Sequence, residues 1–241
     1  MKINLNTELD PQSKIIVALD VPSAAEAIDL CDRLPEVGFW KIGLELFIAD
    51  GKTILRELKA RNKKIFLDLK LHDIPNTVGS ACRVATRYGV DFLTIHASGG
   101  KSMMQAAQSE IQGSSTSLLA VSLLTSISSL ELKSDLQVPL EVSEYVSKLI
   151  FLAQSSGLTG AVCSPHEVFN LRSQLQTILG TNFCFVTPGV RPAGAAVGDQ
   201  SRVMTPKDAI AAGADYLVIG RPITAAPDPV LAWQQICQEL I

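Results

Sequence analysis

Short runs of strand-forming residues alternate along the chain with longer amphipathic segments, and this alternation limits the possible folds more than any other feature. The expected strands are residues 15–20, 38–42, 64–69, 91–96, 117–123, 160–163, 183–187 and 216–219. The expected helices are residues 23–34, 45–61, 77–88, 100–112, 142–156, 166–177, 206–212 and 223–240. Repeated strand–helix units are typical of parallel strands joined by crossover helices. Eight such units predict an α/β fold, a single closed (β/α)8 TIM barrel, with an open doubly wound sheet as the alternative.

The chain has 241 residues, a length that α/β barrels reach as one domain. No low-complexity linker or break in composition divides it, so residues 1–241 are expected to form a single domain. Two connections, residues 125–139 and 188–204, are longer than the others. The second is rich in Gly and Ala, and we expect it to be a mobile lid over the active face of the barrel.

The composition favours a cytoplasmic α/β enzyme. Lys and Arg number 21 against 24 Asp and Glu, without the basic excess expected of a nucleic-acid-binding protein. The five cysteines are widely spaced, as is typical of reduced thiols in a cytosolic protein, and neither they nor the three histidines have the spacing of a zinc site. The first 14 residues are polar and no apolar run could span a membrane, so neither a signal peptide nor membrane attachment is expected.

The expected third strand ends in a cluster of charged residues. By the two-residue period of a strand, Asp68 and Lys70 share one face, and Asp73 follows three residues later. Neighbouring carboxylates favour the protonated form of a lysine, which makes Lys70 a candidate general acid. A purely structural ion pair at the end of the strand is the alternative.

Polar residues also follow the other expected strands. The residues at or just after these strand ends are Asp20, Lys41, His96, Thr125 and Ser126. In a (β/α)8 barrel the C-terminal ends of the strands build the active site. Charges of both signs that converge from three neighbouring strands favour a functional site over a structural role.

The connection after the last expected strand has the features of a phosphate site. Gly220 would let the backbone approach a ligand closely, and Arg221 offers a planar cation. In barrels the loops after strands seven and eight commonly bind phosphate. Arg191 and Gln200, in the long loop after strand seven, are expected to complete the site.

With these residues in place, the sequence resembles the orotidine 5′-phosphate decarboxylase family in its bacterial form. The motifs are Val-Ala-Leu-Asp at 17–20, Lys-Ile-Gly at 41–43, Phe-Leu-Asp-Leu-Lys-Leu-His-Asp-Ile-Pro-Asn-Thr at 66–77, Leu-Thr-Ser at 124–126, Thr-Pro-Gly-Val-Arg-Pro at 187–192 and Ile-Gly-Arg-Pro-Ile at 219–223. Asp-x-Lys-x-x-Asp alone would be shared with related sugar-phosphate decarboxylases and synthases. The Ile-Pro-Asn-Thr that follows it is far more specific.

The resemblance implies a cofactor-free conversion of orotidine 5′-phosphate to UMP and carbon dioxide, the last step of pyrimidine nucleotide synthesis. It implies that Lys41, Asp68, Lys70 and Asp73 form a charged network, with Lys70 protonating C6. It also implies a homodimer in which Asp73, Ile74 and Thr77 reach into the partner's site. The substrate-binding residues that it implies are Asp20, Lys41, Asp68, Ile74, Thr77, Thr125, Ser126, Pro188, Arg191, Gln200, Gly220 and Arg221, and it implies no role for residues 128–141.

Two other functions are compatible with the same barrel. A sugar-phosphate decarboxylase or aldolase-type synthase would proceed through an enediolate and normally need Mg²⁺. A catalytically silent binder of a phosphorylated metabolite would keep Arg221. It would have no use for two carboxylates beside two lysines in the same pocket.

Overall fold

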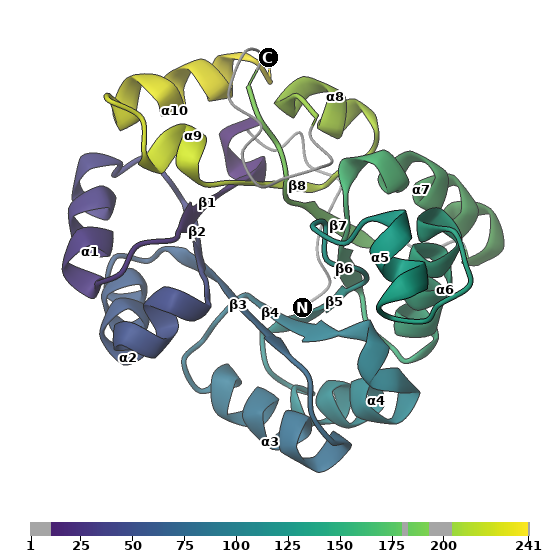
Figure 1. The fold of residues 1–241 in the computed structure, drawn as a ribbon. Coiled ribbons are helices and arrows are strands. Elements are labelled where there is room, and N and C mark those ends of the chain that lie inside the picture. Colours follow the sequence, from purple (N-terminus) through teal and green to yellow (C-terminus); the bar gives the residue numbers. More distant parts are fainter. Residues whose placement is uncertain (1–10, 180–182, 193–203, 241) are drawn as a thin grey trace.

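The computed structural model describes residues 11–179, 183–192 and 204–240 (Figure 1). Eight parallel strands close into a barrel in the order β1-β2-β3-β4-β5-β6-β7-β8, and helices surround it (Figure 1). The predicted (β/α)8 barrel is therefore confirmed, and the alternative of an open sheet is wrong. Within the described residues, no helix is long and apolar enough to span a membrane.

The strands begin and end close to the predicted positions. They are β1 Ile15–Leu19, β2 Phe39–Ile42, β3 Lys64–Leu71, β4 Phe92–His96, β5 Ser117–Val121, β6 Gly160–Val162, β7 Cys184–Thr187 and β8 Tyr216–Ile219. Most differ from the expected ranges by one or two residues at an end. β3 is extended by two residues and carries the charged cluster within the strand.

The helices lie outside the barrel (Figure 1). They are α1 Ala24–Arg33, α2 Leu44–Ala60, α3 Pro75–Thr86, α4 Gly100–Glu110, α5 Ser129–Ser134, α6 Val142–Ser155, α7 Pro165–Leu179, α8 Pro206–Ala211, α9 Arg221–Thr224 and α10 Pro229–Gln238, with the short 3-10 helices η1 Pro11–Lys14 and η2 Ala97–Gly99.

One sequence prediction about helices was wrong, and one long connection contains a short helix that was not predicted. The single helix expected at 223–240 is two helices, because Asp228 caps a new helix by accepting hydrogen bonds from the backbone N–H groups of Val230 and Leu231. The connection at 125–139 contains α5, whose first turn is closed by a capping box between Ser128 and Glu131. Both helices begin where a side chain caps the backbone N–H groups of the first turn. This signal is local, whereas the helices were predicted from the spacing of apolar residues over longer segments.

The side chains of the barrel strands form two apolar clusters, one on each face of the sheet. The larger cluster fills the space between strands and helices and contains Val17, Trp40 and Leu67. The smaller cluster fills the inside of the barrel, and its members are Ile16, Ala18, Phe39, Phe66, Phe92, Leu119, Cys184, Val186, Tyr216 and Val218. Since side chains alternate along a strand, residues that follow these inward members at intervals of two also point into the barrel.

Aromatic rings fill part of this interior. Phe66 and Phe92 pack edge to face with centroids 6.0 Å apart, and Tyr216 lies edge-on to Phe92 at 5.4 Å. Edge-to-face pairs of this kind add stability beyond the area that they bury. Asp68 follows Phe66 by two residues, so the charged residues sit directly above an apolar floor.

Gly160, at the start of β6, allows three strands to approach closely. A Cβ atom there would lie 2.6 Å from Leu119 Cδ2 and 2.9 Å from the backbone oxygen of Cys184, on the two neighbouring strands. We expect Gly160→Ala to destabilise the fold by about 1–3 kcal/mol, as overpacking does in other cores. Gly38→Ala is the matched control, because a Cβ at Gly38 meets nothing within 4 Å. Chemical denaturation of the two variants measures the difference, and equal stabilities would contradict this account.

Candidate active site

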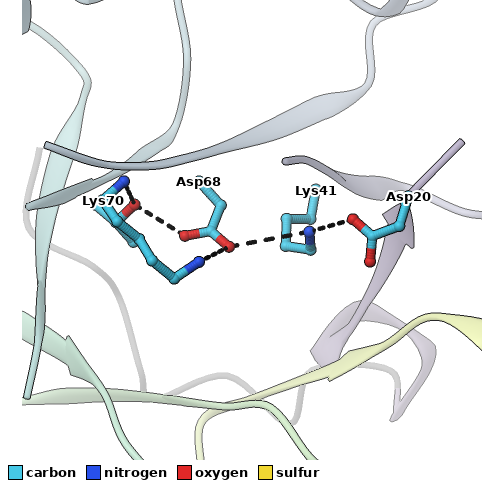
Figure 2. Close-up of polar contacts among 5 residues, drawn as sticks. Asp20, Lys41, Asp68 and Lys70 are labelled. Carbon is cyan, nitrogen blue, oxygen red and sulfur yellow. Dashed lines mark hydrogen bonds and ion pairs between the residues drawn. The ribbon is translucent and has the colours of Figure 1, made fainter. Parts of the chain in front are cut away.

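Four charged side chains form a continuous row at the C-terminal end of the barrel (Figure 2). Lys41 Nζ lies 2.7 Å from Asp20 Oδ1 and 3.9 Å from Asp68 Oδ2. Lys70 Nζ lies 2.7 Å from the same Asp68 Oδ2. The row therefore alternates acid, base, acid and base, and Asp68 is shared by both ammonium groups.

The inner members of this row are well removed from solvent. The side chains of Lys41 and Asp68 are 10% and 12% exposed, whereas those of Lys70 and Asp20 are 30% and 55% exposed. Charges buried to this degree are costly unless each has a partner. Two lysines and two aspartates compensate one another, and removal of any one would weaken the compensation of its neighbours in the row.

The backbone at Lys70 departs from regular strand geometry. Its φ of 49° falls in the left-handed region, which is uncommon and strained for a residue other than glycine. The register between β3 and β4 also shifts between Leu67 and Leu71. A regular two-residue period along β3 predicts that Lys70 lies beside Asp68. The two side chains do meet, but through this irregular backbone.

The row lines a cavity of about 570 Å³. The predicted site residues in its wall are Asp20, Lys41, Asp68, Lys70, Thr125, Ser126, Pro188, Arg191, Gly220 and Arg221. The sequence analysis did not identify the apolar and backbone parts of the wall, namely Ala18, Phe66, Val121, Leu123, Leu124, Val162, Cys163, Gly189 and Val218. Most of these apolar residues belong to the strands or follow them directly. The alternation of side chains along each strand could therefore have identified the ones that point into the barrel.

Three predicted residues lie elsewhere in the single chain. Asp73, Ile74 and Thr77 are exposed and do not line the cavity. The Asp73 carboxylate accepts a hydrogen bond of 2.6 Å from the backbone N–H of Ile74, at the start of α3. Gln200 lies outside the described residues, as do residues 193–203 of the expected lid.

Two arginines line the same cavity: Arg191 follows β7, and Arg221 begins α9 directly after β8. Burial and the positive charge of Arg221 both lower the pKa of Arg191 from its usual value. Two neighbouring guanidinium groups repel each other, and an anion bound between them would relieve that repulsion. The geometry therefore favours a negatively charged group, such as a phosphate, beside these arginines.

Two histidines lie beside the charged row. The rings of His72 and His96 are 5.3 Å apart, and His96 is partly buried at the end of β4. Burial lowers the pKa of His96, and electrostatic repulsion from His72 and Lys70 lowers it further, against a smaller opposing effect of the Asp68 carboxylate. His96 therefore stays neutral at pH values where a solvated histidine begins to take up a proton. Within the described part of the chain, no group of three or more His, Cys, Asp or Glu side chains could hold a metal ion.

The arginine pair predicts that inorganic phosphate stabilises the folded protein. At ten times its Kd, a single bound anion adds about 1.4 kcal/mol of stability. We expect phosphate to raise the Tm of the wild type and Arg221→Ala to remove most of this increase. Arg33→Ala, at the exposed end of α1, is the control and should keep it. A phosphate response that Arg221→Ala leaves intact would place the anion elsewhere.

Comparison with known proteins shows the family of this chain. The model of the "Orotidine 5′-phosphate decarboxylase / HUMPS family" matches residues 13–236. An orotidine 5′-phosphate decarboxylase of Gloeothece citriformis is 59% identical over 229 residues, which cover 94% of this chain and 97% of that protein. A second, of Moorella thermoacetica, is 48% identical over 95% of this chain and 92% of its own length.

A solved structure shows the same similarity in three dimensions. The crystal structure of orotidine 5′-phosphate decarboxylase from Lactobacillus acidophilus superposes with a TM-score of 0.82 at 38% identity, covering 95% of this chain and 99% of that one. The family match and these identities extend over nearly the whole chain. The chain therefore belongs to the orotidine 5′-phosphate decarboxylase / HUMPS family.

Proposed function

We propose that this protein removes the carboxylate of orotidine 5′-phosphate to give UMP and carbon dioxide, without a cofactor, in the last step of UMP biosynthesis. The observation that carries the proposal is the alternating row of four charges in one cavity with two arginines. A ligand with a phosphate at one end and a reacting carboxylate at the other matches these two charged regions. The relatives whose names state this activity cover more than nine-tenths of the chain.

Lys70 is the proton donor in this proposal. Loss of carbon dioxide breaks the bond between C6 of the pyrimidine and its carboxylate carbon, and the electron pair stays on C6. The Lys70 ammonium then gives a proton to C6, which forms the new C–H bond and leaves a neutral amine. A cation fixed in place before the reaction stabilises the developing negative charge without reorganisation. The ion pair with Asp68 supplies that fixed position.

Asp68 has a second role, because its carboxylate would face the carboxylate of the substrate. Two negative charges at close range are unfavourable in the ground state, and the departure of carbon dioxide relieves this repulsion. Favourable contacts at the distant phosphate can offset that cost during binding. The charged row and the arginine pair are contributed by different strand ends of one cavity, which fits such a division of roles.

The remaining cavity residues bind the substrate. The phosphate is assigned to Arg191, Gln200, Gly220 and Arg221, of which Gln200 lies outside the described residues. Asp20 and Lys41, joined by a hydrogen bond of 2.7 Å, are assigned to the ribose hydroxyls. The pyrimidine ring is assigned to Thr125, Ser126 and the backbone around Pro188, which line the cavity wall.

The active unit is a homodimer in this proposal, with Asp73, Ile74 and Thr77 contributed to the partner's site. Their exposure supports this assignment, since Ile74 is 67% exposed although it is large and apolar. Leu44 and Ile48 on α2 are also exposed, at 50% and 80%. Exposed apolar side chains near the mouth of the barrel are typical of a surface that a partner covers. A cytoplasmic location is also proposed, in keeping with five buried free cysteines.

The role of Lys70 is tested by steady-state kinetics with orotidine 5′-phosphate in the presence of EDTA. We expect wild-type turnover to UMP, and we expect Lys70→Ala to lower kcat by about a thousandfold, as loss of a general acid does. Lys148→Ala, on the exposed face of α6, is the control and should behave as the wild type.

Three results would contradict the proposal. Turnover that persists in Lys70→Ala would assign the proton to another group. A folded wild type that is inactive on this substrate, yet acts on sugar phosphates once Mg²⁺ is added, would favour the enediolate chemistry of a synthase instead. Binding of UMP without any turnover would indicate a catalytically silent binder.

The dimer assignment is tested by mixing two inactive variants, Lys70→Ala and Asp73→Ala, under conditions that exchange subunits. If Asp73 serves the partner's site, each mixed dimer has one intact site, and random pairing restores about a quarter of wild-type activity. A mixture of Lys70→Ala and Asp68→Ala is the control, because both residues belong to the same strand and the same site. No recovery in the first mixture would mean that Asp73 acts within its own subunit.

A further inference from the structure

Thr94 is a fully buried polar residue in the middle of β4, with 0% of its surface exposed. Phe92, two residues earlier on the same strand, belongs to the apolar cluster inside the barrel. By the alternation of a strand, Thr94 points into the barrel one layer above Phe92. It therefore lies at the level of Asp68, which stands two residues after Phe66.

Thr94 faces the irregular part of β3. Leu67 pairs with Leu93 and Leu71 pairs with Ile95, so three residues of β3 lie opposite Thr94 alone. A bulge of this kind interrupts the ladder of backbone hydrogen bonds and redirects side chains, often beside an active site. The backbone N–H of Lys70 lies within the bulge and needs an acceptor other than a backbone carbonyl of β4.

The Thr94 hydroxyl supplies that acceptor and also holds Asp68. Lys70 N lies 2.9 Å from Thr94 Oγ1, and Thr94 Oγ1 lies 2.9 Å from Asp68 Oδ1. The N–H group can only donate, so the threonine oxygen accepts from it. The ionised carboxylate can only accept, so the hydroxyl proton points to Asp68. The direction of both hydrogen bonds is therefore fixed.

We propose that Thr94 is a positioning residue for the decarboxylation described above: its hydroxyl holds the left-handed backbone of Lys70 and the carboxylate of Asp68 in one arrangement. This inference rests on the proposed function. With Oδ1 bound to Thr94, the other oxygen of Asp68 is turned toward the two lysines, 2.7 Å from Lys70 Nζ. Thr94 does not line the cavity, so it acts through its two neighbours.

Loss of the hydroxyl has two physical consequences. The N–H of Lys70 loses its partner, and the strained φ of 49° loses one of the contacts that maintain it. Asp68 loses the hydrogen bond that fixes Oδ1, so its carboxylate can turn away from the orientation in which Oδ2 is shared by the two lysines. Misplacement of a reacting group by about 1 Å can cost about a hundredfold in rate.

The test compares Thr94→Val, which keeps the shape but removes the hydroxyl, with Thr94→Ser, which keeps the hydroxyl. We expect Thr94→Val to lower kcat about a hundredfold while KM and the affinity for UMP change little, because the hydrogen bonds of Thr94 go to Lys70 and Asp68 and not to the residues assigned to the phosphate. Thr94→Ser should return kcat to within about fivefold of the wild type. A serine variant as slow as the valine variant would overturn the inference.

Thr116→Val is the matched control. Thr116 is also a buried threonine, 5% exposed, and its hydroxyl donates a 2.8 Å hydrogen bond to the backbone oxygen of Val90, away from the cavity. We expect it to lower the Tm but to leave kcat per folded molecule unchanged. If Thr94→Val lowers kcat no more than Thr116→Val does, Thr94 has only a structural role.

Two further measurements separate a folding defect and an inactive wild type from the role of Thr94. If Thr94→Val does not fold, Thr94→Ala is compared with Thr94→Ser by the same kinetics, and equal kcat values would overturn the inference. Wild-type turnover is measured in parallel. An inactive wild type would refute the proposed function, whereas an active wild type with an equally active Thr94→Val would refute only the role of Thr94.

Discussion

The carboxylate of Asp68 is the interaction on which the rest of the site depends. One of its oxygens is shared by Lys41 and Lys70, and the other accepts from Thr94. An ionised carboxylate this far from water is stable only if its lone pairs are used in this way. The partners come from β2, β3 and β4, so the position of the Asp68 side chain depends on how these three strands pack together.

The barrel can maintain such an arrangement because its interior is divided into layers. Inward-facing aromatic and aliphatic residues fill the lower part, and the charged residues sit directly above them. A close-packed floor of this kind deforms little, so the strained backbone of Lys70 is held by surroundings that cannot easily adjust. The same floor excludes water from beneath the charges and strengthens their interaction.

The site is also divided along its length. Connections after β7 and β8 supply the cations Arg191 and Arg221, whereas the ends of β1, β2 and β3 supply the alternating acids and bases. A substrate that is anionic at both ends can be bound at one and destabilised at the other. In the proposed reaction, this division would let binding free energy at the arginines contribute to catalysis at Lys70.

The barrel could be predicted from the amino-acid sequence, because eight alternations of strand and helix allow few other folds, and so could the charges at the strand ends. The same pattern also predicts Asp20, Lys41, Asp68 and Lys70 in one cavity, since parallel strands end at a common face. The shift between β3 and β4, the left-handed backbone of Lys70 and the two hydrogen bonds of Thr94 become visible only in the folded barrel. These features depend on how β3 pairs with β4, and the paired residues Lys70 and Thr94 are 24 positions apart in the sequence. The alternation of side chains within either strand does not reveal how the two strands align.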